Sequence, residues 1–220
     1  MKKEKEPLTI EKIKAAHRER RAEILEKLAE FSRILKSETD ERFWEEMVFC
    51  FFTGGCSARM GLRSIEAVRP LLLAGNHAEL SAALVGRHRY PNARAAYIVA
   101  SREFLQEHCG LRLREKLNGF DNDPARRDWL VKEKRIKGLG YKEASHYLRN
   151  LGYRGYAILD KHILRSLAEL EIIADPQPPN TRAKYLLIEE KLKNLAELTE
   201  IDFDELDLVL WSMKTGEILK

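Results

Sequence analysis

Lys142 and Asp160 are the residues of this chain whose types and spacing most clearly suggest chemistry. Lys142 ends the segment Ile-Lys-Gly-Leu-Gly-Tyr-Lys at residues 136–142, and Asp160 follows eighteen residues later. A neutral lysine amine is a nucleophile that forms Schiff bases with carbonyl carbons. A carboxylate can accept a proton or stabilise a developing cation. The pair therefore predicts covalent catalysis at an electrophilic carbon.

The two glycines before Lys142 predict the tight turn of a helix-hairpin-helix, a motif that binds nucleic-acid phosphates. Gly138 and Gly140 carry no Cβ, so the backbone of the turn can approach a ligand closely. Lys142 is then expected at the start of the second helix, where unpaired N–H groups and the helix dipole favour an anion. Lys137 would add positive charge beside a DNA phosphate. The alternative is an ordinary turn between helices, whose glycines only permit a positive φ.

An amine and a carboxylate beside a DNA-binding turn fit a reaction that cuts a base from its sugar. Burial and the positive end of a helix both favour the neutral, nucleophilic form of Lys142. Its attack on C1′ of a flipped nucleotide would displace the base and form a Schiff base, and β-elimination would then break the strand. The alternative for Lys142 is an exposed lysine or a phosphate contact. Asp160 is also the expected N-cap of the helix that follows, and we expect His162 to be structural.

The amino-acid composition limits the classes of protein to which this chain can belong. The 220 residues are 44% hydrophobic and 34% charged, which indicates a globular chain with a sizeable core. The net charge is +4, but the charges are unevenly distributed along the sequence. Residues 126–154 include nine Lys or Arg and three acidic residues, whereas residues 195–210 include six acidic residues and no basic one. The first stretch predicts a basic face that suits a polyanion. The alternative is that both stretches are solvated helix faces.

The cysteines predict reduced thiols. Cys50, Cys56 and Cys109 match neither a four-cysteine iron–sulfur pattern nor a paired-cysteine zinc pattern. An odd number in a chain without a signal peptide indicates the interior of a cell. No apolar run approaches the roughly 20 residues that span a bilayer, so no membrane partner is expected.

The spacing of apolar residues predicts an all-α chain. The strongest local signals are glycine at helix ends and Asp-Pro at 123–124 as a helix start. The hairpin is expected over residues 130–151. The expected helices cover residues 9–36, 40–52, 62–74, 77–86, 91–108, 123–135, 141–151, 160–170, 181–197 and 203–215.

These segments resemble the helix-hairpin-helix DNA glycosylase superfamily, in which a hairpin lysine precedes a Gly/Pro-rich loop and an aspartate. The resemblance is closest to the compact archaeal-type 8-oxoguanine DNA glycosylase/AP lyase family. It is carried by residues 136–153, by Ile-Leu-Asp-Lys-His-Ile-Leu at 158–164 and by the C-terminus. It implies a single helix-hairpin-helix glycosylase unit over 1–220, with two helical lobes that flank a base-binding cleft.

The same resemblance implies roles for four residues. Lys142 matches the Schiff-base lysine and Asp160 the catalytic aspartate. Trp211 and the terminal carboxylate of Lys220, which we expect to be free, match residues that recognise the damaged base; without the resemblance they would be core packing and a chain end. Relatives with an iron–sulfur cluster have four cysteines after this region. This chain has none after Cys109, so no metal or cofactor is expected.

The resemblance implies base-excision DNA repair by a cytoplasmic, nucleoid-associated monomer that removes 8-oxoguanine from duplex DNA and nicks the strand. Two alternatives stay open. The same chemistry could act on another damaged or mismatched base; loss of selectivity for 8-oxoguanine on deletion of Lys220 would instead support 8-oxoguanine as the substrate. A helix-hairpin-helix DNA-binding module without catalysis would need the glycines but neither Lys142 nor Asp160.

Overall fold

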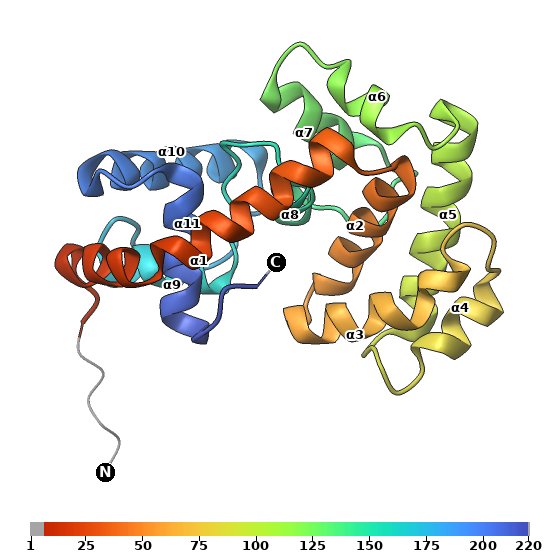
Figure 1. Ribbon diagram of the computed structural model, residues 1–220, viewed down its shortest axis with the longest axis horizontal. Coiled ribbons are helices and arrows are strands. Elements are labelled where there is room, and N and C mark those ends of the chain that lie inside the picture. Colours follow the sequence, from red (N-terminus) through yellow and green to blue (C-terminus); the bar gives the residue numbers. More distant parts are fainter. Residues whose placement is uncertain (1–6, 220) are drawn as a thin grey trace. The chain divides into compact units, whose positions relative to one another are not determined.

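In the computed structural model of this protein, residues 7–219 are described, and these residues form helices and no strand (Figure 1). The all-α prediction is therefore confirmed. The helices are α1 (Ile10–Ser37), α2 (Asp40–Thr53), α3 (Ala58–Val68), the 3-10 helix η1 (Arg69–Leu71), α4 (His77–Leu84), α5 (Pro91–Cys109), α6 (Leu113–Asn118), α7 (Asp123–Lys132), α8 (Tyr141–Asn150), α9 (Lys161–Glu169), α10 (Arg182–Thr199) and α11 (Phe203–Thr215).

Most of the predicted helices agree with the structure, and the differences have local causes. The helix expected over 62–74 begins earlier, because the Ser57 hydroxyl accepts a hydrogen bond from the Met60 N–H at 3.2 Å and caps α3. The helix expected to reach Arg135 ends at Lys132. Its C-cap residue, Glu133, is extended, and its carboxylate accepts a hydrogen bond from the Arg135 N–H at 3.0 Å. The short helix α6 was not predicted.

The chain divides into two compact units, which are described separately. The first contains residues 7–30 and 154–219 of the described chain, and therefore the N-terminal part of α1 together with α9, α10 and α11. The second contains residues 31–153, from the end of α1 through α8. The predicted hairpin thus lies wholly in the second unit.

Helix α2 forms the centre of the second unit. Ten of its residues are buried, including Phe43, Trp44 and Met47, and it packs against α3, α5, α6 and α8. A helix that is apolar on all sides has to be surrounded by other helices. Helix α8 packs on α2, and Ala144, Tyr147 and other residues of α8 are fully buried. This contact holds the start of α8, which carries Lys142, on a rigid base.

In the first unit, α10 fixes the extended segment that leads into α9. The Tyr185 hydroxyl donates a hydrogen bond to the Ala157 carbonyl at 2.7 Å. The Ala157 N–H donates to a carboxylate oxygen of Glu189 at 3.0 Å, and both side chains belong to α10. These buried bonds satisfy the backbone of a segment that forms no helix of its own. They also determine where Asp160, three residues further on, begins α9.

The predicted basic face is only partly correct, because several of its charges are buried. Arg126, Arg127 and Arg149 are 8%, 2% and 6% exposed. Arg127 donates from Nη1 to the Ser145 hydroxyl at 3.1 Å and so joins α7 to α8. These three of the nine basic residues hold helices together inside the second unit, whereas Lys137 is exposed.

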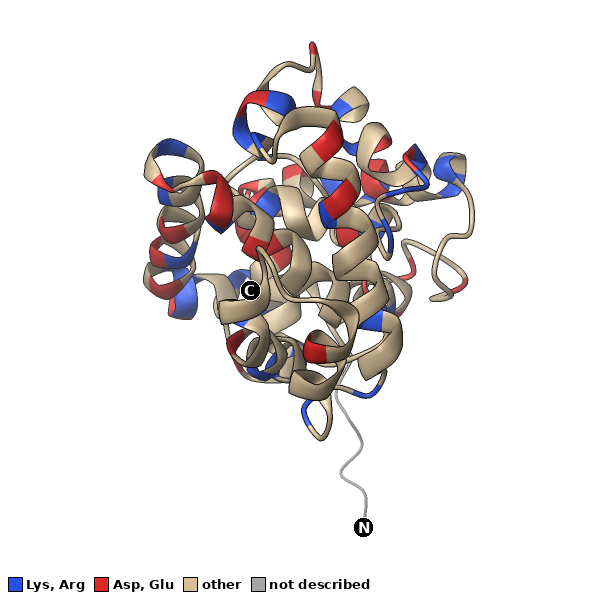
Figure 2. Ribbon diagram, turned by 90° about the vertical axis from the view of Figure 1, so that its right-hand side faces the viewer, with Lys and Arg blue, Asp and Glu red and all other residues tan. Residues whose placement is uncertain are grey.

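The acidic stretch is also not a simple solvated face. Asp204, Glu205 and Asp207 are each less than 8% exposed. Glu205 lies 2.6 Å from Nε2 of His17 and so joins α11 to α1 within the first unit. Figure 2 shows positive and negative residues interspersed along the helices rather than separated.

Candidate active site

The turn between α7 and α8 is anchored by two apolar residues and one hydrogen bond. Ile136 and Leu139 are 5% and 7% exposed, while Lys137 and Gly138 between them are exposed. The Lys137 N–H donates to the Ser101 hydroxyl of α5 at 2.9 Å. The turn is therefore held by Ile136 and Leu139 and presents the two residues between them to solvent.

Gly138 is required in this turn for two separate reasons. Its φ is +77°, a conformation that strains residues with a side chain. A Cβ on Gly138 would also lie 2.8 Å from Cδ2 of Tyr97, closer than carbon atoms pack. The turn therefore approaches α5 as closely as backbone can, which goes beyond an ordinary turn whose glycine only permits a positive φ.

The same turn offers backbone donors to a ligand. Within residues 7–219, the N–H groups of Gly138, Leu139 and Gly140 have no hydrogen-bond acceptor. Gly140 is the N-cap of α8 and has no side chain to cap it. Exposed N–H groups at a helix start, with the positive end of the helix dipole behind them, favour a phosphate. Lys137 lies beside them with its side chain exposed.

Lys142 is the second residue of α8, as predicted. Its side chain is 25% exposed, and Nζ lies 3.0 Å from Oε1 of Glu143. Sequence reasoning did not single out Glu143. The available signal was its place three residues after the Gly140 N-cap, where a glutamate commonly folds back over the helix start. It does so here, since Oε2 lies 3.3 Å from the position that a Cβ on Gly140 would take.

Arg94 of α5 is a second residue that sequence reasoning missed. Its Nη2 donates to the Gly54 carbonyl at 2.5 Å, and its guanidinium lies over the Tyr97 ring at 5.2 Å. Gly54 ends α2 and lies next to Glu143, because a Cβ on Gly54 would be 3.7 Å from Glu143 Oε1. Nothing local in the sequence marks Arg94, since its partner is forty residues away.

Asp160 caps α9, which confirms the predicted structural role. Its Oδ1 accepts hydrogen bonds from the N–H groups of His162 and Ile163 at 2.7 and 2.9 Å. The cap holds the carboxylate in one orientation at the helix start. Asp160 belongs to the first unit and Lys142 to the second.

Trp211 lies on α11 and is partly exposed, so it is not simply a core residue. Its ring meets the His162 ring edge to face, with centroids 6.5 Å apart. Burial lowers the pKa of His162, and the charge of Asp160 opposes this effect. A neutral His162 beside Trp211 agrees with the structural role expected for it. Lys220, the other predicted base-recognition residue, lies outside the described residues.

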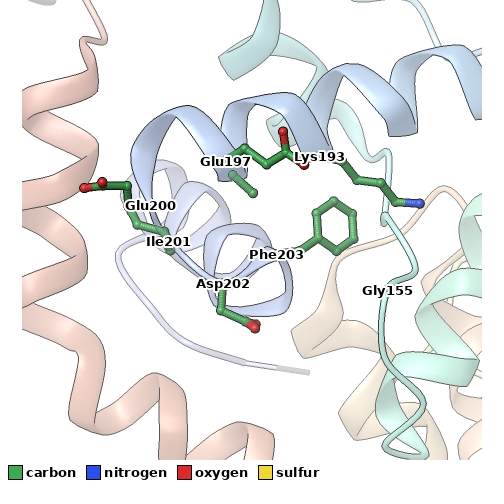
Figure 3. A pocket seen from close by; sticks show the side chains of 8 residues that line it. Gly155, Lys193, Glu197, Glu200, Ile201, Asp202 and Phe203 are labelled. Carbon is green, nitrogen blue, oxygen red and sulfur yellow. The ribbon is translucent and has the colours of Figure 1, made fainter.

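A surface pocket in the first unit has a different character. It has a volume of about 460 Å³ and lies at the end of α10 and the start of α11 (Figure 3). Glu197, Glu200 and Asp202 line it, and Lys193 lies with Nζ 5.9 Å from the Phe203 ring centroid. Three acids do not suit a phosphate, and the pocket includes none of the predicted site residues.

The three cysteines are free thiols. In the described part of the chain, no group of three or more His, Cys, Asp or Glu side chains could hold a metal ion. None of the described helices is both long and apolar enough to cross a membrane.

A glycine turn with open backbone donors, followed at once by a lysine in the first turn of a helix, is the arrangement of helix-hairpin-helix DNA glycosylases. A family model described as 8-oxoguanine DNA glycosylase matches residues 24–201. The chain belongs to this family.

Several relatives resemble the chain over most of its length. The 8-oxoguanine DNA glycosylase/AP lyase of Korarchaeum cryptofilum is 40% identical over 200 residues, which cover 90% of this chain and 91% of that protein. The enzyme of the same name from Methanocaldococcus jannaschii is 35% identical over 97% of this chain and 100% of its own.

Solved structures of relatives are also similar. The crystal structure of the Methanocaldococcus jannaschii 8-oxoguanine glycosylase/lyase in complex with a 15mer DNA containing 8-oxoguanine matches with a TM-score of 0.88 and 35% identity. The match covers 96% of this chain and 99% of that one. The 8-oxoguanine DNA glycosylase of Thermotoga maritima matches with a TM-score of 0.86 and 32% identity, over 96% and 98% of the two chains.

Proposed function

We propose that this protein removes 8-oxoguanine from duplex DNA and then cleaves the strand at the abasic site, as a base-excision repair enzyme. The observation that carries the proposal is the position of Lys142, an amine in the first turn of α8 directly after the open turn at Gly138 and Gly140. The relatives are named 8-oxoguanine DNA glycosylase/AP lyase, which supports both activities.

The proposed reaction begins at C1′ of the damaged nucleotide. The neutral amine of Lys142 forms a bond to C1′ while the C1′–N9 bond breaks, and the electron pair of that bond leaves with the base, which takes up a proton. The nitrogen then loses a proton and the C1′–O4′ bond opens to give the Schiff base, while O4′ takes up a proton and becomes a hydroxyl. The imine acidifies C2′–H; its loss forms a C2′–C3′ double bond and breaks the C3′–O3′ bond, so the phosphate leaves with O3′ and the strand is nicked.

Asp160 is proposed to act as a fixed negative charge during base release. Positive charge develops on the sugar as the C1′–N9 bond breaks, and an oriented carboxylate stabilises it without having to reorganise. The hydrogen bonds from His162 and Ile163 to Oδ1 supply that orientation. The same carboxylate can accept the proton that the amine loses.

Binding and selectivity are proposed to use different groups. The open N–H groups at Gly138 and Gly140, with Lys137, bind the DNA backbone without reading its sequence. The base flips out of the helix and is read by Trp211 and Lys220. 8-Oxoguanine carries a hydrogen on N7, where guanine has an acceptor, so an acceptor in the protein favours the damaged base by roughly 1–3 kcal/mol. We further propose that the protein works at the nucleoid.

The test is a single-turnover assay on three duplexes that differ only in the target base: 8-oxoguanine, guanine or an oxidised pyrimidine. Base release is scored after alkali, and strand cleavage without it. We expect both from the 8-oxoguanine duplex only, and deletion of Lys220 should narrow the preference over guanine. Preferred cleavage at the oxidised pyrimidine would contradict the proposed substrate, and DNA binding without base release would leave a passive binding module.

A further inference from the structure

We infer that Glu143 is a positioning residue that holds the Lys142 amine as an ion pair before DNA binds and so sets the pH range in which the lysine reacts. The inference rests on the proposed function, in which Lys142 is the nucleophile. Its starting point is the 3.0 Å contact between Lys142 Nζ and Glu143 Oε1, the one ion pair found for either side chain among residues 7–219.

The Glu143 carboxylate lies next to two glycines. One of its oxygens lies over Gly140 at the start of α8, and the other lies beside Gly54 at the end of α2. A Cβ on Gly140 would be 3.3 Å from Oε2, so the absence of a side chain there gives the carboxylate room. Glu143 is only 16% exposed, compared with 25% for Lys142. The carboxylate is therefore the more buried partner of the pair.

The remaining charged groups near the start of α8 do not replace this partner. Arg94 reaches Gly54 from α5 and is itself a cation. On α7, Asp128 accepts a hydrogen bond from the Tyr141 hydroxyl at 2.9 Å and pairs with Lys132 at 2.8 Å. Arg127, also on α7, lies over the Tyr141 ring. Within the second unit, Glu143 is thus the carboxylate that lies against the amine.

An ion pair at this position has a direct consequence for reactivity. In the ion pair with Glu143, 3.0 Å away, Lys142 is an ammonium group, which has no electron pair for attack on C1′. The pair has to break, and the amine has to lose a proton, before the Schiff base can form. Because both side chains are partly exposed, the pair is weak enough to be exchanged when DNA arrives.

The experiment measures Schiff-base formation as a function of pH. A duplex with one pre-formed abasic site is mixed with excess protein and cyanoborohydride, and the trapped adduct is followed in a series of buffers. The abasic site removes the base-release step, so the rate reports the amine alone. Glu143→Gln keeps the size of the side chain and removes its charge. We expect it to move the pH midpoint of trapping down by about half a unit, the size of effect that a partly exposed ion pair supplies.

Two further variants make the result specific. Glu143→Asp keeps the charge but shortens the side chain by one methylene, so its midpoint should shift in the same direction by less. Glu103→Gln removes the same charge from an exposed position on α5 and should leave the midpoint unchanged. If Glu143→Gln fails to fold, the shift in the pH midpoint of trapping measured for Glu143→Asp alone tests the inference.

An unchanged midpoint in both Glu143 variants would overturn the inference, even if trapping became slower at every pH, because a uniform loss is what a structural role produces. An upward shift would overturn it as well. Failure of the proposed function looks different: wild-type protein would then form no adduct at any pH, or Lys142→Gln would still form one.

Discussion

The starts of α8 and α9 differ in how each satisfies its first backbone N–H groups. The N-cap residue of α8 is Gly140, which has no side chain to cap the helix, and the three N–H groups of the turn from Gly138 to Gly140 have no acceptor in the described chain. The N-cap residue of α9 is Asp160, whose carboxylate accepts hydrogen bonds from two N–H groups of the helix. One helix start is left open for an anion from outside, and the other is closed by an anion of its own.

This difference assigns the two helix starts to different tasks. An open start followed by lysine can bind a phosphate and present an amine to the same ligand. A closed start cannot bind a second anion easily, but it holds a carboxylate in a defined orientation. The proposed reaction needs both features, a bound nucleotide with an amine and a fixed negative charge.

The largest expected effect separates the charge of Asp160 from its cap. Asparagine caps a helix about as well as aspartate, so Asp160→Asn should leave the thermal midpoint nearly unchanged. Base release should nevertheless fall by about a hundredfold or more, because the carboxylate charge is lost. Single-turnover base release and thermal unfolding of the same sample test this.

Asp160→Ala is the matched comparison, since it removes the cap as well and should cost a further ~1 kcal/mol of stability. Equal activity of wild type and Asp160→Asn would show that the cap is the whole role of this residue.

The second-largest expected effect comes from changing the turn before α8. Gly138→Ala combines an unfavourable φ with a clash on Tyr97, so we expect a loss of roughly 2–3 kcal/mol in the free energy of unfolding and weaker DNA binding. Gly86→Ala is the control, because Gly86 has φ +72° but nothing within 4 Å of a Cβ. It should lose less stability, by chemical denaturation, and bind DNA normally. Equal losses in the two variants would mean that the close approach to Tyr97 is unimportant.

Much of this comparison could be predicted from local sequence signals. The glycines predict the turn and the place of Lys142 at the start of the next helix, and Asp160 predicts the cap, because each depends on residues a few positions away. The Glu143 contact with Lys142 could not be predicted in the same way. It depends on side-chain orientation and on the room left by Gly54, which is far away in the sequence.

Charge along the chain was the least reliable sequence signal. The stretch from 126 to 154 contains nine basic residues, but tertiary packing buries Arg126, Arg127 and Arg149. Burial of an arginine depends on acceptors elsewhere in the fold, such as Ser145 for Arg127. A count of charges cannot distinguish an arginine that joins two helices from one that faces DNA.

A smaller effect concerns Lys137, which is exposed in the turn before α8. Lys137→Ala should weaken binding to damaged and undamaged duplexes alike, because a phosphate contact carries no sequence information. The negative slope of the log binding constant against log salt concentration should become shallower by about one. Lys36→Ala, an exposed lysine at the end of α1, is the control and should leave the slope unchanged. An unchanged slope for Lys137→Ala would remove it from the proposed DNA contacts.

The smallest expected effect is a pH dependence of folding stability that comes from His162, in the first turn of α9. Burial lowers the pKa of His162 in the folded protein, so the unfolded chain takes up a proton first as the pH falls. Stability should therefore decline as the pH drops below about 6.5, by less than about 1 kcal/mol from this group. Chemical denaturation of His162→Gln should show a flatter decline than wild type. His77→Gln, which removes an exposed histidine from α4, should decline as wild type does.

The most direct test of the account is to trap the covalent intermediate and locate it. Wild type and Lys142→Gln are each incubated with a duplex carrying one 8-oxoguanine, reduced with borohydride and digested for peptide mapping. We expect an adduct with wild type only, on the peptide that contains Lys142, while the variant still binds the duplex. An adduct on another residue, or an adduct that persists in Lys142→Gln, would contradict the assignment of Lys142 as the nucleophile.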